Sequence, residues 1–220
     1  MQIDGGMYSG KTGMAYKLLR EWENLAKKHR LKRHKGVIFK TAFDNRGSSD
    51  TVTIHTLSPN DSNHPYIEVP AVPIESMEHG VEYISDHEDI GVGIFDEGHF
   101  IKGMHEESYE RLIGMGILVL STYLDKNFRG EDFCMPNKEE TTNSIRKLTE
   151  RRSANKHIAL FGFCDLSGCL IPASYSQRLL SDGSPAPRDS KTLVVGGKNV
   201  DSKHEVSYIT VCEYHFRPPV

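Results

Sequence analysis

The chain has 220 residues, of which 37% are hydrophobic and 26% charged, a globular composition that excludes wholesale disorder. Its net charge of −3 excludes polyanion binding by bulk charge, and its longest uncharged stretch, residues 112–124, falls short of the roughly 20 residues that cross a bilayer. The four Cys and the opening residues, MQIDGG, predict a reduced, cytoplasmic setting without a disulfide scaffold or a signal peptide.

Apolar periodicity predicts alternating strands and helices, which is typical of an α/β fold with a mostly parallel sheet flanked by helices. A very short strand precedes Gly5, and further strands are expected at residues 36–40, 65–70, 91–95, 117–124 and 157–163. Helices are expected at residues 11–30, 75–86 and 108–115, with a helical stretch within 136–156 and a polar loop from 43 to 65. The spacing predicts buried stripes of Met14, Leu18, Trp22 and Leu25 in the first helix, and of Met77, Val81 and Ile84 in the second.

The composition changes after Phe163, where Gly, Ser, Pro and Asp dominate and strands are expected only at residues 192–197 and 206–211. We therefore predict two domains, an α/β domain over residues 1–160 and a smaller domain over residues 161–220. The basic run at residues 27–35 is interpreted as the solvated end of the first helix, where cations complement the helix dipole, rather than as a nucleic-acid contact.

Residues 5–12 read GGMYSGKT and fit the phosphate-loop pattern G-x-x-x-x-G-K-[ST]. Glycines let the backbone wrap around phosphates, the following helix contributes its N-terminal dipole, Lys11 contributes a charge, and Thr12 offers a hydroxyl to magnesium. The predicted ATP and phosphate ligands in this segment are Gly5, Gly6, Met7, Tyr8, Ser9, Gly10, Lys11 and Thr12.

The apolar run at residues 91–95 ends in Asp96 and Glu97. An acid at the tip of a buried strand is suited to holding magnesium, and the second acid can accept a proton from a nucleophile. Two acids after a strand are weak evidence alone, but together with the phosphate loop they predict a magnesium site at Asp96 and a catalytic Glu97.

Three cysteines and one histidine predict a structural zinc site in the C-terminal domain. Cys164 and Cys169 are separated by four residues, and Cys212 and His215 by two. The remaining thiol, Cys134, is interpreted as an ordinary buried cysteine.

Several short segments carry a family resemblance, in the chain order GGMYSGKT, FDNR, IFDEGHF, YLDKNFRGEDF, ASYSQRL and VVGG, followed by Tyr208, Cys212 and His215. Together they resemble the type II (cytosolic-type) thymidine kinases. The resemblance spans nearly the whole chain, and the short N-terminus favours a viral member. It implies a P-loop α/β domain, with a small zinc domain whose lasso loop closes over the nucleoside. It further implies transfer of the ATP γ-phosphate to the 5′-hydroxyl of thymidine or deoxyuridine, with magnesium and structural zinc as cofactors. A cytoplasmic homotetramer, in the host cytoplasm if viral, is expected, without nucleic-acid or membrane partners.

The resemblance also assigns roles to individual residues. Asp44 and Arg46 match a pair that binds magnesium and phosphate. Asp96 matches the aspartate that binds magnesium, and Glu97 matches the general base that takes the proton of the 5′-hydroxyl. The positions matching residues around the base and sugar are Met7, Phe100, Leu124, Phe128, Ser176, Arg178, Thr192, Leu193, Val194, Val195, Gly196 and Tyr208.

Three departures from the family pattern bear on function. Gly6 replaces the usual Pro, His99 replaces a Gln and could donate to phosphate, and the Cys-x4-Cys spacing is wide. Two alternatives therefore stay open: a P-loop ATPase acting on nucleic acid with its zinc knuckle, and a nucleotide-binding protein with weak catalysis.

Overall fold

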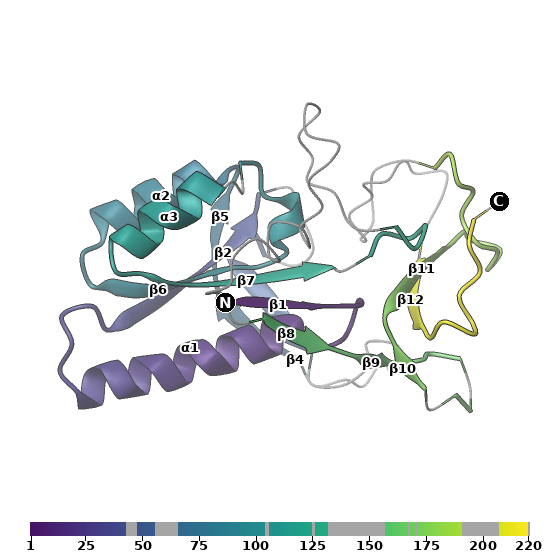
Figure 1. Cartoon of the computed structure of the whole chain (residues 1–220), viewed down its shortest axis with the longest axis horizontal. Coiled ribbons are helices and arrows are strands. Elements are labelled where there is room, and N and C mark those ends of the chain that lie inside the picture. The colour runs from purple at the N-terminus through teal and green to yellow at the C-terminus, as the bar shows by residue number, and fades with distance from the viewer. Residues whose placement is uncertain are drawn as a thin grey trace.

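The computed structural model describes residues 1–42, 48–55, 66–103, 106–124, 126–131, 157–166, 168–169, 171–190 and 207–219. The described part contains a six-stranded sheet in the order β5-β2-β6-β7-β1-β8, and every neighbouring pair is parallel (Figure 1). Its strands are β1 (Gln2–Gly5), β2 (Lys35–Thr41), β5 (Val72–Ile74), β6 (Ile90–Phe95), β7 (Leu118–Leu124) and β8 (His157–Leu160). The predicted α/β fold with a mostly parallel sheet is confirmed.

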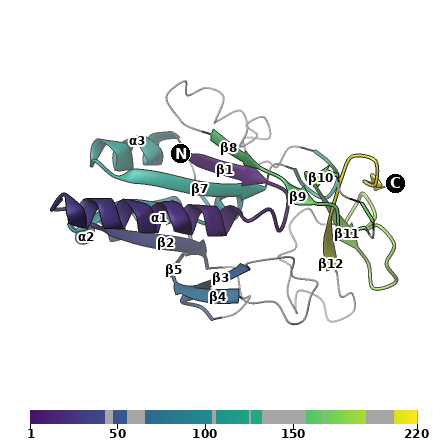
Figure 2. The same ribbon diagram turned by 90° about the horizontal axis from the view of Figure 1, so that it is seen from below.

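Helices cover both faces of the sheet. Helix α1 (Lys11–Lys28) lies on one face, and α2 (Met77–Asp86) and α3 (Glu106–Gly114) lie together on the other (Figures 1 and 2). Alternate residues of a strand point to opposite faces, so Ile38 packs on the α1 side while Phe39 packs on the α2 and α3 side. All six residues of β6 are buried, as expected for a strand covered on both faces.

The predicted buried stripe of α1 is wrong by one residue. The side chains that face the sheet are Lys11, Ala15, Leu19, Glu23 and Ala26, whereas Met14, Leu18 and Trp22 flank the contact and Leu25 is 54% exposed. The small Ala15 and Ala26 let the helix approach the sheet closely. The helix tolerates the buried charge of Glu23, because the carboxylate accepts hydrogen bonds from the N–H of Gly36 at 3.0 Å and from Arg20 at 2.6 Å. In α2 the predicted stripe is confirmed, since Met77, Val81 and Ile84 are all fully buried.

Several expected boundaries differ from the structure. The first helix ends at Lys28, and the strand expected at residues 157–163 is interrupted at Phe161, which separates β8 from β9 (Gly162–Phe163). Within the expected loop at 43–65, β3 (Thr51–His55) pairs antiparallel with β4 (Tyr66–Pro70). This pairing buries Val52 and Ile54 against the α1 side of the core. The expected helical stretch at 136–156 and the expected strand at 192–197 lie outside the described residues.

Beyond the carboxyl ends of β1 and β7 lies a small lobe of short antiparallel pairs (Figures 1 and 2). Strand β9 pairs with β10 (Pro172–Ala173), and β11 (Tyr175–Leu179) pairs with β12 (Ser207–Val211). The predicted domain boundary falls between β8, the last strand of the main sheet, and β9. Strand β11 is not predicted from the sequence, because its residues, YSQRL, are mostly polar. Among the described helices, none has the length and apolar character needed to cross a membrane.

The register of α1 leads to a matched pair of stability tests. Leu19→Ala should lower the free energy of unfolding by about 2–5 kcal/mol, because it empties a packed site next to Gly36. Leu25→Ala removes the same atoms from a largely exposed side chain and should change stability by about 0.5 kcal/mol or less. Urea unfolding of both variants checks this, and equal losses would contradict the observed register.

Candidate active site and metal centre

The phosphate loop connects β1 directly to α1, and two of its glycines are required by geometry. Gly5 has φ 151°, and a Cβ there would lie 2.2 Å from the carbonyl oxygen of Leu160 on the neighbouring strand. Gly10 has φ 82° at the start of α1, a conformation that glycine adopts without strain. At Gly6 a Cβ would make an ordinary contact, 3.4 Å from the backbone of Ser174, so the space does not require glycine there.

Lys11 is buried at the first turn of α1, with its ammonium turned back onto its own loop. Its Nζ donates to the carbonyl oxygens of Gly5 at 3.1 Å and Gly6 at 2.5 Å. Burial lowers the pKa of Lys11 to about 8, and the nearby carboxylates of Glu97 and Asp96 oppose this shift. The loop thus holds a desolvated cation that an incoming phosphate can pair with.

Asp96, at the end of β6, joins the two predicted phosphate motifs. Its Oδ1 accepts from the hydroxyl of Thr12 at 2.9 Å and from the hydroxyl of Thr122 on β7 at 2.7 Å. Burial raises the pKa of Asp96 to about 6, the negative charge of Glu97 adds to the increase, and the two threonine hydroxyls oppose it. Thr12 and Asp96 together offer oxygen ligands of the kind that magnesium prefers.

Glu97 follows in a left-handed backbone conformation, with φ 47° and ψ 47°. Such a conformation is uncommon outside glycine and occurs often at active sites. Its N–H donates to Thr122 Oγ1 at 2.8 Å, so one hydroxyl fixes both acids. The sequence reasoning missed Thr122, because its strand neighbours Ser121 and Tyr123 also carry hydroxyls and the strand pattern does not distinguish among them.

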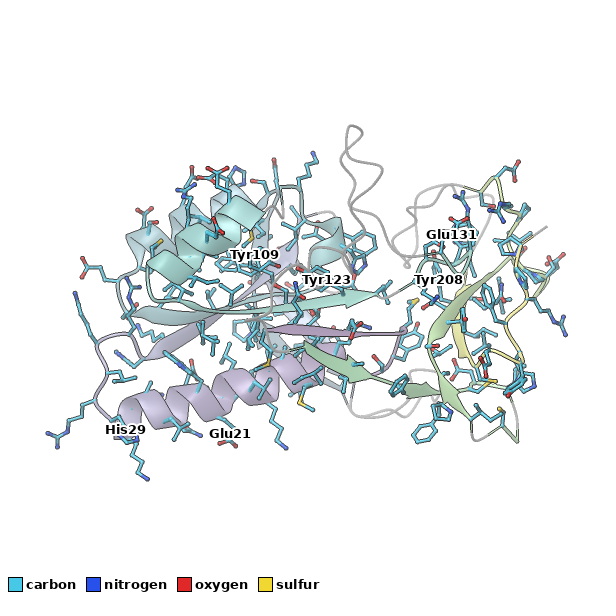
Figure 3. All side chains as sticks on the ribbon, in the orientation of Figure 1. Glu21, His29, Tyr109, Tyr123, Glu131 and Tyr208 are labelled. Atoms are coloured by element: carbon cyan, nitrogen blue, oxygen red, sulfur yellow. The ribbon has the colours of Figure 1, made fainter. Side chains whose placement is uncertain are left out.

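Three of the predicted nucleoside-binding residues come together where the segment after β7, which carries Phe128, meets the small lobe, which carries Arg178 and Tyr208. The guanidinium of Arg178 lies 4.0 Å from the ring centre of Phe128, and its Nε donates to the hydroxyl of Tyr208 at 2.8 Å. Arg178 is only 2% exposed and Phe128 only 3%. Figure 3 shows Tyr208 in this lobe, apart from Tyr109 and Tyr123, which lie next to the main sheet. Burial raises the pKa of Tyr208, against the opposing effect of Arg178.

A polar network that the sequence reasoning missed ties the segment after β7 to the segment after β11. Asn127 accepts from the N–H groups of Arg129 at 2.8 Å and Glu131 at 3.1 Å. Arg129 donates to the carbonyl of Ser190 at 2.9 Å, and Glu131 accepts from Arg188 at 2.8 Å. Two arginines therefore contact Phe128, because the guanidinium of Arg129 also lies 5.2 Å from its ring centre.

His99 and Phe100 lie in a short turn, η1 (Gly98–Phe100), directly after Glu97. The imidazole is fully buried, and its Nδ1 accepts from the N–H of Leu124 at 3.4 Å. His99 therefore contacts the backbone of a predicted pocket residue, and its phosphate contact stays a prediction. The predicted site residues Asp44, Arg46, Thr192, Leu193, Val194, Val195 and Gly196 lie outside the described residues.

The four predicted metal ligands converge in the small lobe. The ligand atoms of Cys164, Cys169, Cys212 and His215 all lie within 4.8 Å of one another. His215 Nδ1 lies 3.4 Å from Cys164 Sγ and 3.3 Å from Cys212 Sγ, and the Sγ atoms of Cys169 and Cys212 are 3.8 Å apart. A tetrahedron with Zn–S bonds of about 2.3 Å has S–S edges of about 3.8 Å. The donor set and its spacing therefore fit one zinc ion.

Comparisons with known proteins include matches that extend over nearly the whole chain. Residues 2–216 match the sequence model of a family described as thymidine kinase. A thymidine kinase of Thermococcus kodakarensis is 31% identical over 223 residues, which cover 99% of this chain and 93% of that protein.

Burial of the Asp96 charge leads to a pH-dependent prediction. The folded pKa of about 6 lies above the ordinary value of 3.8, so ionisation of Asp96 destabilises the fold above about pH 6 and has no effect below about pH 4. Asp96→Asn keeps both threonine contacts and removes the charge. At pH 7 the variant should be more stable by up to about 3 kcal/mol, at about 1.4 kcal/mol for each pKa unit.

Urea unfolding at pH 7 and pH 4 measures this gain, which should disappear at the lower pH. Glu21→Gln on the exposed side of α1 is the matched control and should show no such pH-dependent gain. A variant that is less stable than the parent at pH 7 would contradict the predicted burial penalty.

The metal centre predicts one zinc per purified chain. Cys169→Ser should lose the ion, because a hydroxyl is a poor substitute for a thiolate ligand. Cys134→Ser removes a thiol that is not among the predicted ligands and should retain it. Metal analysis of the parent, Cys169→Ser and Cys134→Ser measures the zinc content per chain and tests this prediction. Zinc retained after Cys169→Ser would identify a different fourth ligand.

Proposed function

This chain belongs to the thymidine kinase family and is a thymidine kinase, and we propose that it transfers the γ-phosphate of ATP to the 5′-hydroxyl of thymidine or deoxyuridine. The observation that carries the proposed mechanism is the hydrogen bond from Thr12 to Asp96. It links the phosphate loop to the strand that carries Glu97, and so brings phosphate binding and proton abstraction to one edge of the sheet.

In this mechanism the loop at residues 5–12 binds the triphosphate. The N-terminus of α1 favours negative charge, and the Lys11 ammonium exchanges two loop carbonyls for phosphate oxygens. Because Lys11 is already desolvated by its own loop, phosphate binding requires little further loss of water from this cation. The interaction is charge-assisted and correspondingly strong.

Thr12 and Asp96 would hold magnesium, with Asp44 as a further ligand. When bound, this ion would neutralise charge on the β- and γ-phosphates. The residues fit the role, because a hydroxyl and a carboxylate that share a hydrogen bond offer two hard oxygen donors. A nearby cation would also oppose the increase in the pKa of Asp96, which keeps the carboxylate ionised at neutral pH.

Glu97 is the proposed general base. Its backbone N–H is fixed by Thr122, so the carboxylate projects from a rigid position next to the phosphate loop. It would accept the proton of the 5′-hydroxyl as that oxygen attacks the γ-phosphorus, while the bond from the γ-phosphorus to the β–γ bridging oxygen breaks and ADP leaves. The proposed role of the Arg178, Phe128 and Tyr208 cluster is to hold the base and sugar in line with that attack.

The nucleoside itself would be recognised by Met7, Phe100, Leu124, Phe128, Ser176, Arg178 and Tyr208, together with residues 192–196. The strongest support comes from Arg178, which contacts the Phe128 ring and donates to the Tyr208 hydroxyl, so that three of these residues form one cluster. Zinc would be structural, because its four ligands leave no open position for a substrate. A homotetrameric state and a cytoplasmic location stay predictions.

Glu97→Gln should lower turnover by roughly 10²-fold or more, because an amide cannot accept the proton. The affinity for ATP should change little, since the phosphate loop and its contacts are untouched. Steady-state formation of thymidine monophosphate over a panel of nucleosides, together with ATP binding measured by calorimetry, tests both statements. Turnover close to that of the parent would remove Glu97 from the mechanism.

A further inference from the structure

Met7, in the phosphate loop, is held at both of its backbone polar groups by side chains from the distant end of the chain. Its N–H donates to Ser176 Oγ at 3.2 Å, and its carbonyl oxygen accepts from Thr210 Oγ1 at 2.8 Å. Both hydroxyl residues are almost completely buried, at 2% exposed for Ser176 and 1% for Thr210. The loop is therefore bound by two specific contacts to the small lobe.

The two hydroxyls act from a shared position in the β11–β12 pair. Ser176 and Thr210 are directly opposite each other in this antiparallel register. Opposite residues of an antiparallel pair project from the same face, so one strand supplies an acceptor for the Met7 N–H and the other a donor to the Met7 carbonyl. This arrangement leaves Met7 little freedom to rotate or shift.

Thr210 is itself fixed next to the metal centre. Its N–H donates to Asp165 Oδ2 at 2.7 Å, and its carbonyl accepts from the N–H of Asp165 at 2.8 Å. Asp165 directly follows Cys164, and Thr210 precedes Cys212 by two residues. Gly162 allows the close approach, because a Cβ there would lie 3.3 Å from Thr210 Cγ2 and 3.6 Å from the Met7 oxygen.

We propose that Thr210 is a positioning residue of the kinase, whose hydroxyl connects the metal-binding lobe to the phosphate loop through Met7. The inference rests on the proposed function, in which residues 5–12 bind ATP. A loop held in place before ATP arrives does not have to be ordered during binding, so the contact favours ATP affinity. Once ATP is bound, its phosphates order the loop, and turnover no longer depends on Thr210.

Thr210→Val keeps the branched shape and the methyl contact with Gly162 but removes the hydroxyl. The KM for ATP should rise roughly 5-fold, the effect of about one net hydrogen bond. At saturating ATP, kcat should stay within about twofold, and the zinc content should be unchanged. Thr210→Ser retains the hydroxyl and should restore the KM for ATP. Ser207→Ala, an exposed hydroxyl on the same strand, is the matched control.

Ser176→Ala provides a second test that leaves β12 intact, and it decides the question if the valine variant does not fold. It removes the acceptor of the Met7 N–H and should weaken ATP binding measured without nucleoside, a readout that is independent of the predicted contact between Ser176 and the nucleoside. If both variants fold, their combination should give less than the product of the two effects, because both bonds hold one residue. An unchanged KM for ATP in every folded variant would overturn the inference. An equal rise in the KM for ATP in Thr210→Ser and Thr210→Val would also overturn it, because the serine variant retains the hydroxyl. Loss of zinc without a change in the KM for ATP would show a purely structural role.

Calorimetric titration of ATP without nucleoside separates this inference from the proposed function. Lys11→Ala should abolish ATP binding if residues 5–12 form the phosphate loop. ATP binding retained in that variant would refute the loop assignment itself. Binding lost with Lys11→Ala but equal to the parent in Thr210→Val would leave the proposed function in place and overturn the role of Thr210 alone.

Discussion

Oδ1 of Asp96 accepts hydrogen bonds from Thr12 on α1 and from Thr122 on β7, and these two bonds join the three elements that carry the chemistry. An ionised carboxylate loses hydration energy when it is buried, so it is tolerated only where donors replace the water. The two hydroxyls satisfy part of that requirement. The remainder appears as the increased pKa of Asp96, to about 6, a shift that a bound cation would oppose.

The position of this cluster follows from the parallel sheet. In a parallel sheet all strands end at one edge, and β1 and β6 lie on either side of β7, so Gly5, Asp96 and the end of β7 are neighbours in space. The same burial acts on charges of both signs there, because it lowers the pKa of Lys11 and raises that of Asp96. Both shifts weaken the preference for the charged forms, although Lys11 and Asp96 are still mainly charged at pH 7. Binding of a polyanionic phosphate and a cation would stabilise both charges.

Most of this arrangement could be predicted from the sequence, because it depends on short motifs with fixed local geometry. The phosphate loop, Asp96 with Glu97, and the four metal ligands are each recognisable within a few residues. Thr122 and Thr210 could not be found in that way, since their roles depend on contacts between distant strands. The predicted rotation of α1 about its axis is wrong by one residue for a related reason. Apolar periodicity predicts a stripe formed by the largest side chains, whereas close approach to the sheet favours the small Ala15 and Ala26.

The small lobe shows why distant contacts matter here. Among the described residues, its buried apolar core consists of Cys164, Ala173, Val211 and Cys212, with Cys169, Tyr175, Ile209 and Phe216 partly buried against it, and three of these residues are predicted metal ligands. A core of this size gives the β11–β12 pair limited support, so polar contacts with the main domain, and the proposed zinc when bound, would add to its order. Those contacts include the two bonds to Met7 and the stacking of Arg178 on Phe128. The lobe and the phosphate loop therefore stabilise each other, and the same residues that order the lobe also position the site where ATP is expected to bind.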